Sequence, residues 1–378
     1  MNTEAFCSHT QNLYNLKTYI LILLAPLLLA VAGLSAQTDS SKSSFSLSGY
    51  VDTYFAYYTD SLSEGTFQQF PTVSPISESI GLNIAQLSAK YSAEKLRATV
   101  TLHYGDIPLS AWSGKYNMLQ EANIGFRICK KLWVDAGFLR THIGAEGLYP
   151  KENIASSISI PTWLEPYYEA GIKLNYLPTD KLTINAFLLN GYNRFEDNNK
   201  KKSGGLQATY IITDQFNIGY TNYIGDDSPE GDSVSHMRFF HNIILNCELN
   251  KFKASAGIDF ATQQNSSVED ADQSASMFSA LLAMRYMIFS NFDIYARGEI
   301  VNDPDGFLSG TFENTHHEIT GLDMKGFTFG GEFKPTENSY LRLEGRQFVA
   351  DDLQKIFHWD GKNTNTRTEI LANLGIWF

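Results

Sequence analysis

Beyond residue 36, the sequence lacks any apolar run long enough to cross a bilayer as an α-helix. The mean hydropathy of −0.21 is also too low for a bundle of membrane helices. Positive charge is scarce, because 29 Lys and Arg residues stand against 41 Asp and Glu residues and give a formal net charge of −12. Nucleic-acid binding requires a basic face, so DNA and RNA are excluded as partners.

Cysteine is rare as well, with 3 residues among 378. Cys7 lies in the N-terminal region, Cys129 in an expected turn and Cys247 near an expected strand end. Export would permit a disulfide between the last two, but two cysteines without a patterned spacing do not predict one. The sequence has no Cys and His spacing typical of a metal site, and we expect neither a metal nor a cofactor.

Common catalytic signatures are also missing, namely a Gly-x-Ser-x-Gly elbow and a His-Glu-x-x-His zinc helix. His103 and His142 lie near expected strand ends, without a Ser or Asp partner close in the sequence. The run His316-His317-Glu318 could hold a metal ion, but chance clustering in a solvated loop is the commoner cause of such a run. We therefore expect that the protein is not an enzyme.

An N-terminal apolar stretch has the features of an export signal. A basic residue precedes the run Tyr19–Leu34, and small residues that end at Ala36 close it. A membrane anchor is the alternative, but Pro26 and the polar stretch that follows disfavour it. We expect a cleaved signal peptide over residues 1–36, a short polar segment over 37–43, and export from the cytosol. The Leu-Ser-Ala-Gln ending resembles that of exported proteins of Bacteroidetes.

From residue 44 onward, apolar and polar residues alternate with a period of two. In Phe252–Ala261 the even-numbered positions are Phe, Ala, Ala, Ile and Phe, whereas the odd-numbered positions begin with Lys, Ser, Gly and Asp. The segments Phe45–Phe55, Leu96–Tyr104, Phe278–Tyr286 and Ile370–Phe378 alternate in the same way. No helix produces this pattern, so the segments are predicted to be β-strands with one apolar and one polar face.

Short and long breaks alternate between these strands. Short breaks are expected at Ser92–Lys95, Cys129–Lys131, Pro178–Lys181, Thr213–Gln215, Asn250–Lys251, Phe289–Asn291 and Pro335–Ser339. Long breaks are expected near 59–79, 106–116, 143–166, 194–203, 225–237, 264–275, 303–323 and 350–366. This asymmetry predicts an all-β fold over residues 44–378, a single antiparallel transmembrane β-barrel of about sixteen strands with short periplasmic turns and long extracellular loops.

A soluble β-sandwich or propeller is the alternative fold, since its strands would also alternate. Connection lengths favour the barrel, and so do aromatic residues near the expected strand ends, where a girdle would lie at the bilayer interfaces. These residues are Tyr54, Phe55, Tyr57, Tyr58, Tyr91, Tyr104, Tyr168, Tyr176, Tyr220, Tyr286 and Tyr340. The ending Leu374–Phe378 also resembles the aromatic-terminated last strand of outer-membrane proteins.

Several short stretches resemble the OmpL-like porin-2 family of β-barrel proteins. They are Gly137–Glu146, Asn153–Pro161, Gly171–Tyr176, Asn190–Asn193, Asp197–Lys201, Leu206–Tyr210 and Asn83–Gln86. The resemblance spans most of the mature chain, although its distinctive part is 137–210. It implies an outer-membrane pore, and it carries over neither a substrate nor site residues.

If the apolar faces contact lipid, the polar faces must line the lumen, because one Arg at the bilayer midplane would cost about 2–4 kcal/mol. A sixteen-stranded barrel is too wide for side chains to fill. Rings of charge set ion preference in pores, although ion pairs could also merely brace the wall. The pore-lining candidates are Arg97, His103, Arg127, Arg285, Arg297, Glu299, Arg342, Glu344, Arg346, Arg367 and Glu369.

The third long break, 143–166, is unusually apolar over its centre, Ile154–Trp163. Long loops without regular structure are usually functional or disordered. In sixteen-stranded general porins the loop at this position folds into the lumen, and this resemblance implies that 143–166 forms a constriction. The candidates are Glu146, Glu152, Ser157, Trp163 and Glu165, with the glutamates facing the arginine-rich wall. The alternative packs the loop against a neighbouring subunit, with Trp163 in the interface.

The function expected is that of a porin, which lets small hydrophilic solutes or ions diffuse passively through the outer membrane. The bacterial outer membrane is the expected location, and its lipid would surround the barrel. A homo-oligomer is left open: trimers are common among general porins, but the sequence displays no recognisable interface. The alternative is a non-conducting barrel used as a surface adhesin or assembly component, with acidic loops such as Gly225–Asp232 as its working part. A TonB-type transporter is excluded, because it needs roughly 22 strands and a plug domain.

Overall fold

The computed structural model describes residues 43–63 and 65–378. The expected signal peptide, 1–36, and almost all of the polar segment, 37–43, lie outside the described residues. Among the residues described, none of the helices has the length and apolar character that a membrane crossing requires. Both cysteines in this part of the chain, Cys129 and Cys247, are free thiols.

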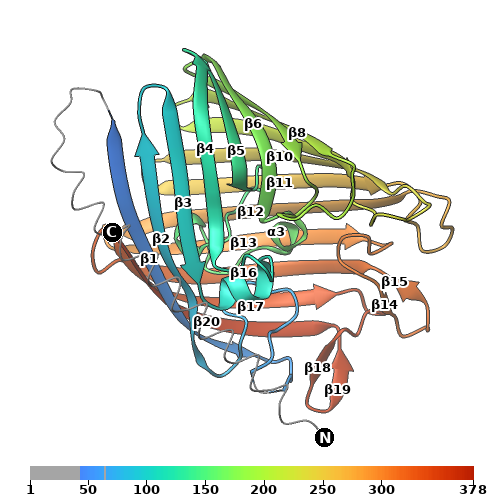
Figure 1. Ribbon diagram of the computed structural model, residues 1–378. Coiled ribbons are helices and arrows are strands. Elements are labelled where there is room, and N and C mark those ends of the chain that lie inside the picture. The colour runs from blue at the N-terminus through green and yellow to red at the C-terminus, as the bar shows by residue number, and fades with distance from the viewer. Residues whose placement is uncertain (1–42, 64) are drawn as a thin grey trace, which may run out of the picture. The chain divides into compact units, whose positions relative to one another are not determined.

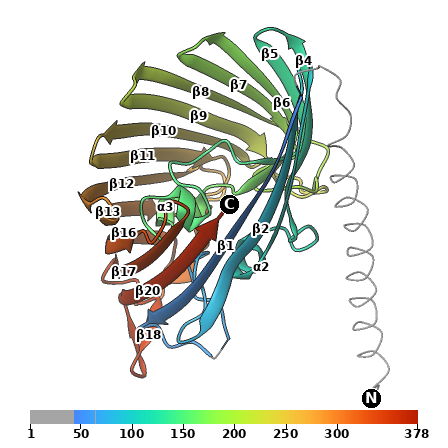
Figure 2. The same cartoon turned by 90° about the vertical axis from the view of Figure 1, so that its left-hand side faces the viewer.

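Sixteen antiparallel strands close into one barrel (Figures 1 and 2). The first eight are β1 (Ser44–Tyr58), β2 (Ile80–Ser92), β3 (Leu96–Tyr104), β4 (Leu119–Cys129), β5 (Leu132–Arg140), β6 (Tyr168–Thr179), β7 (Leu182–Leu189) and β8 (Ser203–Thr213). The others are β9 (Phe216–Asp226), β10 (Met237–Leu249), β11 (Phe252–Gln263), β12 (Ala275–Phe289), β13 (Phe292–Asp303), β16 (Leu322–Phe333), β17 (Ser339–Ala350) and β20 (Thr366–Trp377). The last strand pairs with the first from Tyr50 opposite Trp377 to Tyr58 opposite Glu369, so the barrel has no open edge.

The connections follow the predicted alternation of short and long breaks. Every expected short break contains a tight turn, and the first long loop spans residues 59–79 as predicted. Short elements that the sequence did not predict lie within the long loops. They are α2 (Asp106–Ala111), the 3₁₀ turn η2 (Pro150–Glu152), α3 (Ile160–Leu164), the hairpin of β14 (Phe312–Glu313) with β15 (Ile319–Thr320), and the hairpin of β18 (Phe357–Trp359) with β19 (Lys362–Thr364).

The two faces of each strand differ as the alternation predicts. In β17, Leu343 faces outward with 59% of its surface exposed, whereas the adjacent Glu344 faces inward and is 1% exposed. The predicted girdle is wrong at four tyrosines, because Tyr54, Tyr58, Tyr168 and Tyr340 are buried. Tyr54, Tyr58 and Tyr340 lie on the inner face, where their hydroxyls find hydrogen-bond partners that hydrocarbon could not supply.

An apolar core lies inside the barrel, toward the end that carries the long loops. It joins inward-facing strand residues such as Leu189, Phe240 and Phe348 to Ile160 and Leu164 of α3. A lumen filled with water would not favour apolar residues at these inward positions. They are stable there because the segment between β5 and β6 covers them.

The orientation of β17 predicts different tolerance to charge on the two faces of the barrel wall. Leu343→Arg should lower the free energy of unfolding in lipid vesicles by about 2–4 kcal/mol, because it buries a charge in hydrocarbon. Thr209→Arg, on the half-buried inner face of β8, should cost much less, because its charge can reach lumen water. Denaturant titration of both variants measures the difference, and an equal cost at the two positions would contradict the assigned faces.

Candidate functional site

The segment 143–166 lies within the ring of strands rather than outside it. Figures 1 and 2 both place α3 inside the barrel, and α3 contacts β12 and β13. Local sequence explains the helix: Ser159 caps its first turn by accepting a hydrogen bond from the Thr162 backbone at 3.2 Å, and Pro161 lies in that turn. The apolar residues of this segment thus pack into the barrel core, while its backbone amides and carbonyls face the strands of the wall.

Glu344 of β17 holds the middle of the segment. Its carboxylate accepts hydrogen bonds from the backbone amides of Ser156, at 2.7 Å, and Ser157, at 3.2 Å. The Ser157 hydroxyl and the Tyr295 hydroxyl donate to the same carboxylate. Four donors around one buried carboxylate compensate its charge, and hydrogen bonds to charged groups are the strong ones.

Arg297 of β13 binds the same stretch of the segment through its positively charged guanidinium. Its guanidinium donates to the Glu146 carboxylate at 3.0 Å, to the Ser157 carbonyl at 2.6 Å and to the Ile158 carbonyl at 3.3 Å. The Arg297 side chain has no exposed surface. The five donors of a guanidinium suit this role, because they can bind several carbonyls and a carboxylate at once.

Further pairs extend the anchor in both directions along the segment. Glu299 accepts a hydrogen bond from the Ile160 backbone at 2.5 Å and forms an ion pair with Arg346 at 2.8 Å. Arg342 donates to the carbonyls of Pro150, at 2.7 Å, and Ala155, at 3.0 Å.

Arg285 donates to the carbonyls of Asn153, at 3.1 Å, and Ile154. Arg285 and Arg342 both pair with Glu332, which the sequence analysis did not single out.

A second loop, 59–79, also enters the mouth of the barrel. The guanidinium of Arg367 donates to the Gln69 carbonyl at 2.9 Å and pairs with Glu369 at 2.6 Å. The ring of Phe70 packs edge-on against Trp163, with centroids 5.2 Å apart. Trp163 therefore contacts another loop of the same chain.

The pore-lining candidates thus fall into two groups. Eight of them (Arg285, Arg297, Glu299, Arg342, Glu344, Arg346, Arg367 and Glu369) lie on β12, β13, β17 and β20 and contact the inserted loops or one another there. The other three lie on β3 and β4: Arg97 and Arg127 flank the Trp133 ring at 4.5 and 4.7 Å, and His103 lies 3.1 Å from the Tyr149 hydroxyl.

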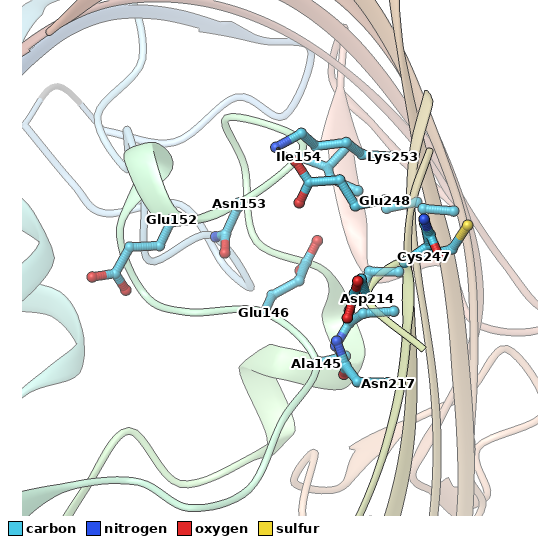
Figure 3. Close-up of a pocket in the computed structure, with 15 residues that line it drawn as sticks. Ala145, Glu146, Glu152, Asn153, Ile154, Asp214, Asn217, Cys247, Glu248 and Lys253 are labelled. Carbon is cyan, nitrogen blue, oxygen red and sulfur yellow. Dashed lines mark hydrogen bonds and ion pairs between the residues drawn. The ribbon is translucent and has the colours of Figure 1, made fainter. Parts of the chain in front are cut away.

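A cavity of about 320 Å³ remains between the segment and strands β9 to β12. Figure 3 shows Glu146 and Asn153 of the segment on one side of it, and Asp214, Asn217 and Lys253 of the wall on the other. A second cavity of about 370 Å³ shares Glu248 and Lys253 with the first. Since these two residues flank the short turn between β10 and β11, the open part of the lumen lies toward the short-turn end.

The glutamates of the segment differ in their surroundings. Glu146 pairs with Arg297, and Glu152 pairs with Arg140 at 2.5 Å. Glu165 is 4% exposed, and neither of its carboxylate oxygens has a hydrogen-bond partner. Burial raises the pKa of Glu165 well above its usual range, and the nearby carboxylates of Asp259 and Glu146 raise it further.

His142 ties the start of the segment to the wall. Its Nδ1 lies 2.7 Å from the Glu169 carboxylate and its Nε2 lies 2.9 Å from the Asn222 carbonyl. Both partners are acceptors, so the ring satisfies both only when it carries two protons. Burial lowers the pKa of His142, but the Glu169 carboxylate and the two hydrogen bonds outweigh burial and leave the pKa raised.

Comparison with known families assigns the chain. The sequence profile of one family, described as "Putative beta-barrel porin-2, OmpL-like", matches residues 44–378. The protein belongs to this porin family. The match confirms the resemblance that the sequence stretches indicated, and no curated protein matches this porin.

Solved outer-membrane barrels share the fold of this porin at low sequence identity. OmpT of Vibrio cholerae is 11% identical, with a TM-score of 0.54 over 91% of this chain and 100% of that chain. The outer-membrane channel DcaP of Acinetobacter baumannii is 9% identical, with a TM-score of 0.59 over 90% and 99% of the two chains. OmpF of Salmonella typhi, in complex with daunomycin, is 10% identical, with a TM-score of 0.56 over 88% and 97%. These likenesses confirm the predicted sixteen-stranded barrel.

The anchor at Glu344 predicts a local effect of its removal. Glu344→Gln replaces one acceptor oxygen by an amide group, which leaves a backbone donor of Ser156 or Ser157 unpaired and should destabilise the segment by about 2–3 kcal/mol. Hydrogen exchange at the amides of residues 156–160 should become faster, while exchange in β17 stays slow. Glu248→Gln, at an exposed strand end, is the control. Unchanged exchange in the segment would show that Glu344 does not hold it.

The raised pKa values of Glu165 and His142 predict that stability falls as the pH rises. A group whose pKa is higher in the folded protein than in the unfolded chain stabilises the fold at low pH, and this contribution is lost as the pH passes its folded pKa. The unfolded value for Glu is about 4.3. The free energy of unfolding should therefore decrease as the pH rises above about 4.3 toward the raised folded pKa of Glu165, and Glu165→Gln should flatten that decrease. An equal slope in both proteins would exclude a contribution from Glu165.

Proposed function

We propose that this porin passes small hydrophilic solutes or ions by passive diffusion and that segment 143–166 forms its constriction. The observation that carries the proposal is the position of the segment, which is fixed inside the barrel by Arg297 and Glu344 and borders the open cavity with its other side. A segment held by buried charge-assisted hydrogen bonds presents a fixed width to a passing solute. Selection would then depend on that width and on the charges that remain accessible, without a covalent or energised step.

The charged residues that solvent can reach are not the ones that the alternating sequence pattern places on the inner wall. Arg297, Arg346 and Arg367 are each at most 3% exposed, so they support the constriction rather than contact solutes. The accessible charges near the cavity include Glu152, Glu248 and Lys253. We therefore propose that the arginine-rich wall acts as the anchor of the segment, with Glu146 as its ion-pair partner.

The protein would reach the outer membrane by export, with a signal peptide over residues 1–36, and its apolar outer face would contact lipid. A homotrimer, the assembly common among general porins, is part of the same proposal.

Single-channel recording tests the pore directly. Purified residues 37–378, refolded into a planar bilayer under a salt gradient, should give discrete current steps. The reversal potential would report which accessible charges dominate. Silence from protein shown to be folded would overturn the pore and support the non-conducting adhesin or assembly role.

Cysteine labelling tests the constriction separately. Ile154 is a half-buried segment residue that lines the cavity, so Ile154→Cys, in a background with Cys129→Ser and Cys247→Ser, places one thiol there. A bulky membrane-impermeant thiol reagent should lower the conductance of this variant, because the label occupies the solute path.

The control for labelling is Ser233→Cys, in an exposed part of the loop between β9 and β10, where complete labelling should leave conductance unchanged. Full labelling of Ile154→Cys without any change in current would contradict the proposed constriction.

A further inference from the structure

Charge is unevenly distributed over the inner wall of the barrel. Charged residues lie in mid-strand on β13 and β17, as Arg297, Glu299, Glu344 and Arg346 do. Strands β7 and β8 carry no charged residue, and β9 and β10 carry Asp, Glu or Arg only within two residues of a strand end. Segment 143–166 lies against the charged strands β12, β13 and β17. The first cavity lies between the segment and β9 to β12, so two strands without Asp, Glu, Lys or Arg in mid-strand, β9 and β10, form part of its wall.

Carboxamide side chains form a hydrogen-bonded row across β6, β7 and β8. Asn175 of β6 donates to the Asn185 side-chain carbonyl of β7 at 2.8 Å, and Asn185 donates to the Gln207 carbonyl of β8 at 2.7 Å. Gln207 donates in turn to the backbone carbonyl of His142 at 2.9 Å. These residues face each other across neighbouring strands in the sheet register, so the row crosses three strands at one height.

A second carboxamide pair lies on the cavity itself. Asn246 of β10 donates to the side-chain carbonyl of Asn217 of β9 at 3.1 Å, and both residues line the cavity together with Ser255. A carboxamide has two donor hydrogens and an acceptor oxygen with two lone pairs. Each partner in these pairs therefore keeps hydrogen-bonding capacity that a solute can use, and the half-buried side chains leave it accessible.

The charged residues of the cavity are mostly compensated. Five charged side chains line it, and four of them have an ion-pair partner: Glu146 pairs with Arg297, Glu152 with Arg140, and Glu248 with Lys253 at 2.6 Å. The fifth, Asp214, lies in the turn between β8 and β9. An ion that leaves bulk water here would lose hydration without meeting a matching wall of opposite charge.

We propose that the solute path follows this carboxamide wall and that the pore favours uncharged polyhydroxylated solutes of saccharide size over ions of the same size. Hydroxyl groups both donate and accept, as carboxamides do, so each can exchange its water for a wall hydrogen bond. The cavity volume of about 320 Å³ lies in the range typical of small-molecule sites, about 300–1,000 Å³. This solute class rests on the proposed porin function and specifies it further.

Vesicle swelling with solutes of matched size tests the solute class in the unmodified protein. Glucose is neutral, gluconate is an anion and glucosamine is a cation, and the three have nearly the same size. Glucose should enter faster than both charged solutes. Equal rates for the three, or faster entry of gluconate or glucosamine, would overturn the proposed preference. No entry of any solute, from protein shown to be folded, would instead overturn the porin function.

Variants test the wall itself. Asn217→Leu with Asn246→Leu removes the cavity carboxamides and should slow glucose about fivefold, as expected for the loss of one hydrogen bond. Asn338→Leu, the same change in an exposed turn, should leave the rate unchanged. Asn246→Asp should raise the entry of glucosamine relative to glucose. Heat-modified mobility on gels verifies that each barrel has folded, and unchanged solute ratios in folded variants would place the path elsewhere.

Discussion

The burial of charge on one half of the inner wall is the constraint on which the rest of the structure depends. The Arg297 side chain has no exposed surface, and Glu299 and Glu344 are almost as deeply buried. Leaving such a charge without partners would cost several kcal/mol. The backbone amides and carbonyls of segment 143–166 supply those partners, and the wall in turn satisfies a backbone that would otherwise be buried without hydrogen bonds. Wall and segment are therefore stable together in a way that neither is alone.

Because the segment is bound to the wall, it divides the lumen into a closed part and an open part. Toward the loop end, α3 and loop 59–79 close over an apolar core that includes Leu189 and Phe348. Toward the short-turn end, the lumen stays open in two cavities. One lies against β9 to β12, and the other is also lined by charged residues of β12, β16 and β17, namely Arg285, Glu332 and Arg342. A porin of this design would use its buried wall arginines mainly to hold the constriction in place, so the number of arginines on the wall is a poor guide to its ion preference.

Local sequence patterns were enough to predict the barrel, but not which loops lie inside it. Alternation and turn residues are properties of neighbouring positions, and they predicted the strands, the short turns and the loop 59–79 closely. Whether an inward residue contacts water or protein depends on loops far away in sequence. For this reason Tyr340 was misplaced in an interfacial girdle although it bonds to Asp52 across the barrel seam. The insertion of loop 59–79 was missed too, although Phe70 and Val73 within it gave the same kind of apolar signal as segment 143–166.

The most direct test of this account is the conductance of a variant in which residues 151–163 are replaced by a short glycine–serine linker. The linker removes the backbone partners of Arg297 and Glu344 together with α3. The account predicts a folded barrel of lower stability and a clearly larger single-channel conductance than the parent protein. A folded variant with the parent's conductance would show that the segment does not narrow the pore.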